Sequence, residues 1–273
     1  METNHTPDKT GGISGFVLKM TAVVTMLVDH IAASPLEQYL VANGMADFSH
    51  GLFYVYLLMR TIGRMAFPIY LYLLVEGFYH TRSRAKYALR LLIFAVISEV
   101  PFDMALMASF SDLSHNNVFF TLLISLLTIW GMDEAAKRFA AEERDSGETV
   151  PPAEQIPFGR KKISLKGKLL QILIFLAGCA GAELMHTDYS AGGVIAAVLI
   201  YLFWNRGWVS GAIGVCSLGI SSGIIEFAAL LILPLLIFYN GKRGPQIKYF
   251  FYLFYPVHLL ILGLICYTAG FWH

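Results

Sequence analysis

Long apolar runs alternate with short polar segments along most of the 273-residue chain. A membrane-spanning helix needs about 20 mostly apolar residues, whereas a barrel strand shows apolar and polar positions in strict alternation. These runs do not alternate, so the pattern predicts an all-α, polytopic membrane helix bundle. We expect about nine transmembrane helices, at residues 14–34, 50–78, 85–108, 117–138, 166–186, 190–205, 208–222, 224–240 and 247–270. The seventh is short and Gly-rich, and could be a complete or a broken span.

The loops between these helices differ in their basic residues. Lys and Arg gather in alternate loops, with Arg82 and Lys86 in the second and several more in the fourth. Because Lys and Arg mark cytoplasmic loops, we expect a cytoplasmic N-terminus and an external C-terminus. The chain is therefore predicted to form a single integral membrane domain over residues 1–273, in the cell inner or plasma membrane. A cytoplasmic linker is expected at about 140–165.

The composition supports a membrane protein and excludes some functions. Hydrophobic residues make up 56% of the chain and charged residues 14%, whereas about a quarter of a soluble domain is charged. The net charge is +1, and no basic stripe indicates a nucleic-acid partner. The three cysteines lie singly within apolar runs, without the spacing of metal ligands, so no metal site is expected.

Ionisable residues lie inside the first two predicted spans. Asp29 and His30 lie about 15 Å beyond Lys19 along the first helix, toward its outer end. Arg60 and Arg64 are four residues apart near the middle of the second helix, and so share one face. A guanidinium at that depth costs at least about 2.5 kcal/mol on insertion scales, so the pair needs an anionic partner or a wet cavity. Such residues indicate a functional site, although Asp29 and His30 could also cap their helix.

Further polar residues are expected on the outer side or within the last helix. An Asn before a helix is as well explained by capping as by substrate binding. A His inside a helix is as well explained by a hydrogen bond to a backbone carbonyl. A role in substrate binding is the alternative for each. The candidates are Glu99, Asp103, Asn117, Asp188, Tyr189 and His258.

His30 is the candidate general base. A neutral histidine takes a proton from an amine or hydroxyl nucleophile if its pKa stays near the working pH. Asp29 cannot readily orient it, because adjacent side chains on a helix diverge. We therefore expect an orienting carboxylate from another helix, with Glu99, Asp103 and Asp188 as candidates.

Six blocks of the sequence, in this order, resemble the TraX family. They cover nearly the whole chain outside the two polar segments, and the DH and RxxGRxAFPI motifs are the most specific. The blocks are LKMTAVVTMLVDHI, RTIGRMAFPIYLYLLVEGF, SEVPFD, NNVFFTLL, TDYSAGGV and KYFFYLFYPVHLLIL. The family is named for a conjugative-plasmid protein associated with N-terminal acetylation of pilin. It also looks related to the wider integral-membrane acyltransferases that modify surface sugars.

The resemblance implies acetyl transfer from cytosolic acetyl-CoA to an acceptor amine, such as a peptide or pilin N-terminus, at the outer side of the membrane. Carried over by motif, His30 would be the base, with Asp29 beside it. Arg60 and Arg64 would position the phosphates or the thioester of the donor. The acceptor side would be shaped by Glu99, Asp103, Asn117, Asp188, Tyr189 and His258.

Other functions stay open from the sequence. The acceptor could be the hydroxyl of a cell-surface glycan or lipid-linked sugar. A proton-coupled transporter would also place charged residues in mid-membrane, but no pair of broken helices recurs in two halves. A catalytically silent scaffold is disfavoured by the cost of two mid-depth arginines.

Overall fold

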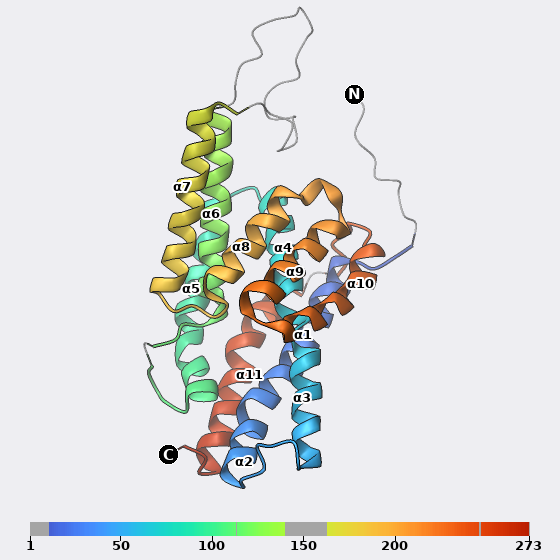
Figure 1. The fold of residues 1–273 in the computed structure, drawn as a ribbon, viewed down its shortest axis with the longest axis vertical. Coiled ribbons are helices and arrows are strands. Elements are labelled where there is room, and N and C mark those ends of the chain that lie inside the picture. Colours follow the sequence, from blue (N-terminus) through green and yellow to red (C-terminus); the bar gives the residue numbers. More distant parts are fainter. Residues whose placement is uncertain (1–10, 113, 140–162, 246, 273) are drawn as a thin grey trace, which may run out of the picture.

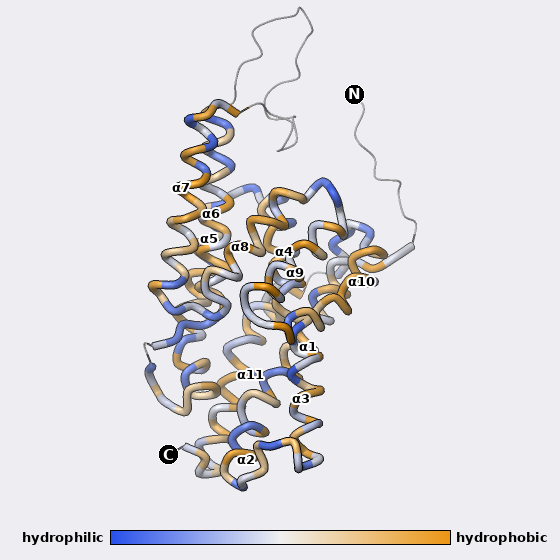
Figure 2. The backbone as a smooth tube through the Cα atoms, viewed as in Figure 1, coloured by the Kyte–Doolittle hydropathy of each residue, from blue (hydrophilic) through white to orange (hydrophobic). Residues whose placement is uncertain are grey.

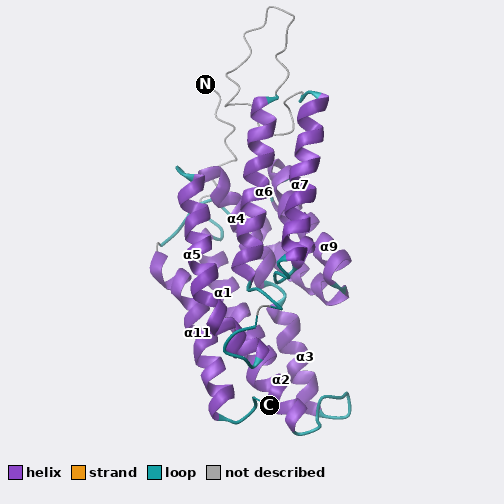
Figure 3. Cartoon of the chain, turned by 90° about the vertical axis from the view of Figure 1, so that its left-hand side faces the viewer, coloured by secondary structure: helices purple, strands orange, loops and turns teal. Residues whose placement is uncertain are grey.

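A computed structural model describes residues 11–112, 114–139, 163–245 and 247–272 (Figure 1). Within these ranges every regular element is helical, and Figure 3 shows helices joined by loops. Isolated backbone bridges join Ile13 to Tyr239 and Asn116 to Thr187. The all-α prediction is confirmed for this part of the chain. Most of the predicted linker, residues 140–162, lies outside the described residues.

Each of the nine predicted segments coincides with helical structure. The first continues beyond its predicted end, the second is interrupted, and the eighth begins as a 3₁₀-helix. In chain order the elements are α1 (Gly15–Ile31), η1 (Ala32–Leu36), α2 (Glu37–Ala42), α3 (Gly51–Gly63), α4 (Ala66–His80), α5 (Arg84–Phe102), η2 (Asp103–Met107), α6 (Val118–Arg138), α7 (Leu165–Leu184), α8 (Ser190–Leu202), η4 (Trp204–Arg206), α9 (Trp208–Ser222), η5 (Ile224–Ile232), α10 (Leu233–Ile237) and α11 (Lys248–Thr268).

Within the described ranges, five helical segments are long and apolar enough to cross a membrane: Gly15–Ala42, Gly51–His80, Val118–Arg138, Leu165–Leu184 and Phe250–Thr268. Hydrophobic residues run along their length in Figure 2. Helices α8 and α9 and the η5–α10 segment are apolar but shorter. Helix α5 is long enough, but four of its residues are charged. These helices support a membrane protein, while nine spans and a cytoplasmic N-terminus stay predictions.

Prolines explain where the long helices deviate from regular α-helix. A proline lacks the backbone N–H and its ring clashes with the carbonyl four residues earlier, which widens or breaks the helix. Pro35 lies within the π-helical η1, and Pro101 lies two residues before the π-helical η2. Pro68 follows Arg64 by four residues, and there α3 gives way to α4. Arg64 therefore lies at a turn, between two helices.

Helix α4 lies at the centre of the packed core. It contacts α1, α6, α8 and α9, and Leu71 and Val75 on it are fully buried. Helices α6 and α7 pack as a hairpin along one side in Figure 1, whereas α1, α3 and α11 lie together beside α2. The shorter α8, α9 and η5 pack on one another between these groups. The arrangement places the end of α1 between α3 and α11.

Segments predicted to share a side of the membrane contact one another. At one end of the bundle, the N–H of Gly15 donates to the carbonyl of Lys242 at 2.8 Å. At the other end, the hydroxyl of Ser34 donates to the carbonyl of Ala105 at 2.6 Å, joining the two π-helical segments. These contacts agree with the predicted alternation of loops, without identifying the cytoplasmic side.

The α6–α7 contact leads to a prediction about two glycines on one helix. A Cβ on Gly178 would overlap the Thr128 side chain, whereas a Cβ on Gly181 would meet open space. We expect Gly178→Ala to lower the free energy of unfolding by about 1–3 kcal/mol through overpacking. Gly181→Ala is the matched control, and should leave it unchanged or raise it by up to about 1 kcal/mol. Thermal unfolding in detergent measures both, and equal midpoints for the two variants would contradict the packing.

Candidate active site

A cavity of about 280 Å³ lies where α1, α3, α4, η2 and α11 meet the loop before α8. Its walls are part polar and part aromatic, with Phe67, Tyr70 and Tyr255 among the rings. Helices distant in sequence therefore deliver polar groups to one place. Six of the residues expected from the sequence line it: Asp29, His30, Arg60, Arg64, Asp188 and Tyr189.

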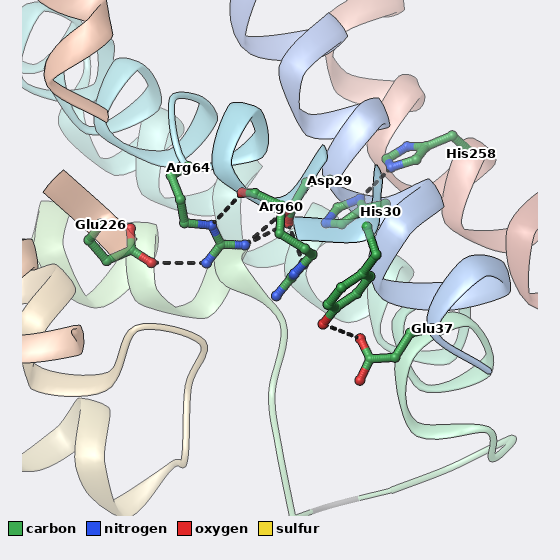
Figure 4. A network of polar contacts seen from close by, with 8 residues as sticks. Asp29, His30, Glu37, Arg60, Arg64, Glu226 and His258 are labelled. Carbon is green, nitrogen blue, oxygen red and sulfur yellow. Dashed lines mark hydrogen bonds and ion pairs between the residues drawn. The ribbon is translucent and has the colours of Figure 1, made fainter. Parts of the chain in front are cut away.

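An ion cluster, drawn in Figure 4, lines the cavity through Asp29, Arg60 and Arg64. Asp29 pairs with Arg60 through Oδ2 at 2.9 Å and with Arg64 through Oδ1 at 2.8 Å. The other side of Arg64 pairs with Oε1 of Glu226 on η5, at 2.9 Å. Two carboxylates thus compensate two guanidiniums, and the formal charge of the cluster is zero. The anionic partner that the arginines require comes from within the bundle, and Asp29 does not cap its helix.

The two arginines differ in how many of their guanidinium nitrogens already have partners. Each guanidinium nitrogen of Arg64 already has an oxygen partner, because its Nε donates to the carbonyl of Arg60 at 3.2 Å. Arg60 contacts Asp29 through Nη1, and its side chain is 24% exposed. Arg60 is therefore the arginine with capacity for a ligand, and Arg64 holds the cluster together.

Gly63 allows α1 and α3 to approach closely enough for these ion pairs. A Cβ at this position would overlap the Cβ, Cγ and Oδ1 atoms of Asp29. Gly63 is the last residue of α3, and its neighbour Arg64 lies at the turn before α4. The glycine in the RxxGRxAFPI motif thus gives Asp29 room between the two arginines.

His30 points away from the ion cluster, toward α11. Its Nδ1 lies 2.6 Å from Nε2 of His258, and the two rings are nearly parallel with centroids 5.0 Å apart. This differs from the expected orienting carboxylate of Glu99, Asp103 or Asp188. The reason is that α11 packs directly on α1, so the histidine on α11 reaches His30 first. Nδ1 of His258 in turn lies 2.6 Å from the carbonyl of Phe254.

Four of the predicted substrate-binding residues do not line the cavity: Glu99, Asp103, Asn117 and His258. The Asn117 amide donates to the Glu99 carboxylate and to the carbonyl of Ala95, and its oxygen caps α6 by accepting from the N–H of Phe119 at 3.0 Å. Asp103 accepts from the backbone N–H of Asp112 at 2.9 Å. Capping accounts for Asn117, and a substrate role for the four stays a prediction.

Asp188 and Tyr189 lie in the loop between α7 and α8, outside the membrane-spanning helices. Tyr189 has a left-handed backbone, with φ of +62°, and its ring stacks on Phe67 with centroids 3.8 Å apart. The Asp188 carboxylate lines the cavity, and no described residue hydrogen-bonds it. Burial raises the pKa of Asp188 to about 6, although Arg64 and His115 act in the opposite direction. Burial also raises the pKa of the Tyr189 phenol well above its usual value.

Some residues of the site were not predicted from the sequence. Glu226 lies inside the apolar run of η5. An acid in such a run is a candidate partner for arginines in another apolar segment, and this signal could have paired it with Arg64. Glu37 also lines the cavity and accepts a hydrogen bond from Tyr56 at 3.0 Å. No signal in the linear sequence indicates that Tyr255 would form part of the wall.

The cavity can hold a small polar group together with a short apolar chain. It offers an imidazole, a partly free guanidinium and two carboxylates with capacity for further hydrogen bonds, those of Glu37 and Asp188. Among the residues that the structure describes, no group of three or more His, Cys, Asp or Glu side chains is placed to hold a metal ion. The geometry therefore suits proton transfer beside a stabilised negative charge.

Comparisons with known proteins show the family of the chain. A family described as "TraX protein" matches residues 14–266. The chain is 29% identical over 274 aligned residues to a protein of Dichelobacter nodosus named "Probable fimbrial assembly protein FimC, serogroup H1". That alignment covers 91% of this chain and 94% of the relative. No solved structure gives a significant match.

Removing Asp29 tests the ion cluster. Asp29→Asn leaves Arg60 without its ion-pair partner and Arg64 with Glu226 alone. Loss of one partner from a buried ion pair costs about 3–5 kcal/mol, so we expect a loss of that order in the free energy of unfolding. Asp47→Asn, which removes an exposed pair with His50, is the matched control and should cost far less stability. Unfolding in mixed micelles measures both, and a stable Asp29→Asn would show that the cluster is dispensable.

The raised pKa of Asp188 predicts a pH dependence of stability. The native carboxyl titrates at about 6, against 3.8 when unperturbed, so the native state binds more protons between these values. Stability from this group is therefore present below about pH 4 and is lost as the pH rises through 6. Asp188→Asn should remove this loss of stability. The unfolding midpoint of the variant should therefore lie above that of the wild type, by a margin that grows from pH 4 to 7. A constant difference across that range would contradict the assignment.

Proposed function

The chain belongs to the TraX family, and on this premise we propose that it is a membrane-embedded acetyltransferase. The acetyl group passes from cytosolic acetyl-CoA to an acceptor amine at the outer side of the membrane. A peptide or pilin N-terminus is the favoured acceptor, and the name of the fimbrial assembly relative supports a pilus-related partner. Relatedness to the wider membrane acyltransferases is part of this proposal.

One observation carries the proposal: His30 and Arg60 lie on the wall of the same cavity. Acyl transfer to an amine needs a group that accepts the proton of the nucleophile and donors that stabilise the oxyanion of the tetrahedral intermediate. His30 supplies the first. The part of Arg60 that is not engaged by Asp29 supplies the second.

The size of the cavity limits which part of the donor it holds. Pockets that enclose drug-sized ligands measure about 300–1,000 Å³. A cavity of about 280 Å³ suits the acetyl thioester and the adjoining part of the pantetheine arm, with the nucleotide outside. The ion cluster is formally neutral, so it has no excess positive charge to hold a chain of phosphates. Arg60 is therefore better suited to contact the thioester carbonyl. Arg64, with every nitrogen partnered, acts by fixing Asp29 and so Arg60.

The residues then have the following roles. The amine nitrogen attacks the thioester carbon, forming the C–N bond, while Arg60 donates hydrogen bonds to the carbonyl oxygen as it gains charge. His30 accepts the proton released by the amine. Collapse of the intermediate breaks the C–S bond, and the proton passes from His30 to the CoA sulfur. Asp188, which lines the same cavity, can hold the incoming ammonium before that group releases its first proton to water and becomes the attacking amine.

Direct assay of the purified protein tests this function. With labelled acetyl-CoA and a peptide whose N-terminal amine is free, we expect label in the peptide. His30→Ala should lower turnover by about 10²–10⁴-fold through loss of the base, with acetyl-CoA binding retained. Arg60→Ala should lower turnover by about 10²–10³-fold. His50→Ala, in an exposed loop away from the cavity, is the matched control and should keep wild-type turnover.

The same assay separates the alternatives. Label that survives mild base lies in an amide, whereas label released by base lies in an ester and would favour O-acetylation of a glycan. Uptake of solutes into proteoliposomes without acetyl-CoA would favour a transporter. Full turnover by His30→Ala would show that the proposed base is wrong.

A further inference from the structure

His258 lies behind His30 rather than in the cavity. It is 6% exposed, belongs to α11, and is absent from the cavity walls. Its ring stacks on Phe254 of its own helix, with an interplanar angle of 23°, and lies nearly parallel to the ring of His30 on α1, at 8°. His258 therefore has a fixed orientation, and any effect it has on a substrate passes through His30.

The hydrogen bonds around His258 determine where the protons of the two rings lie. The carbonyl of Phe254 can only accept, so Nδ1 of His258, 2.6 Å away, carries a hydrogen. A neutral His258 then has an unprotonated Nε2, which can only accept. Nδ1 of His30, 2.6 Å from that nitrogen, must be the donor. The remaining nitrogen of a neutral His30, Nε2, is left with its lone pair.

That lone pair is available to the cavity. His30 lines the cavity, and its Nε2 has no hydrogen-bond partner among the residues that the structure describes. In the opposite tautomer of His30, a hydrogen on Nε2 would occupy the position where a base is needed, and two unprotonated nitrogens would face each other at 2.6 Å. The buried His258 excludes that tautomer.

We infer that His258 is a positioning residue that fixes the tautomer and ring orientation of His30, and that Nε2 of His30 is the atom that accepts the proton. The inference deepens the proposed function and rests on it for its catalytic meaning. The carbonyl of Phe254, His258 and His30 form a chain from the backbone of α11 to the cavity. It serves the purpose that a carboxylate serves for many catalytic histidines, without adding a charge to the membrane interior.

Two substitutions of His258 separate positioning from packing. Gln places an amide oxygen near the position of Nε2, and can accept from Nδ1 of His30, whereas Leu fills the space without an acceptor. We expect His258→Leu to lower kcat by about 10²-fold or more with little change in KM. His258→Gln should retain kcat within about tenfold of the wild type. Thr268→Ala, an exposed position at the end of the same helix, is the matched control.

Nitrogen NMR of the histidine rings reads the tautomer without requiring any transfer reaction. In ¹⁵N-labelled wild-type protein and in His258→Gln, His30 should show an unprotonated Nε2, with signals assigned by comparison with His30→Ala. In His258→Leu, both tautomers should appear. A hydrogen on Nε2 of wild-type His30, or equal loss of kcat in the Gln and Leu variants, would overturn the inference. A wild-type protein with the expected tautomer but no acetyl transfer would instead refute the proposed function alone.

Discussion

Two arginines within a long apolar helical segment need compensating partners, and the carboxylates that meet this need organise the structure. Asp29 from α1 and Glu226 from η5 approach Arg64 from opposite sides, and Asp29 also holds Arg60. The cluster therefore ties together three segments that are far apart in the sequence. Gly63 gives the carboxylate of Asp29 its space, and Pro68 turns the chain where Arg64 must reach both acids. Removing any one member would leave the cluster with a net charge, in surroundings that solvate it poorly.

The cluster also gives the neighbouring residues Asp29 and His30 different roles. Consecutive side chains on a helix diverge, so a carboxylate fixed between the arginines turns the next side chain toward another helix. Asp29 faces α3, whereas His30 faces α11 and meets His258. The acid thus stabilises the fold and keeps Arg60 in place. The imidazole, freed from the ion pairs, faces the cavity, where proton transfer can occur beside a guanidinium.

Local patterns predicted the helices and six of the residues that line the cavity. Apolar runs indicated each helical segment, and the expense of mid-membrane charge showed that Arg60 and Arg64 needed acidic partners. The tertiary pairing was predictable only in part. An acid in an apolar run made Glu226 a candidate partner for the arginines, whereas no local signal selects His258, 228 residues away, for His30. The same limit applies to Asn117. Its position before α6 favours capping equally with substrate binding, and only the packing of α5 against α6 shows that it serves the fold.

Acyl transfer between His30 and Arg60 can be tested with a structure of the protein bound to acetyl-CoA. Reacting atoms in a productive complex lie about 3–3.5 Å apart. We expect the acetyl thioester inside the cavity, its carbonyl oxygen within hydrogen-bond distance of Arg60, and space for an amine between the carbonyl carbon and Nε2 of His30. Acetyl-CoA bound with its thioester outside this cavity, in a protein that transfers the acetyl group, would show that the transfer takes place elsewhere.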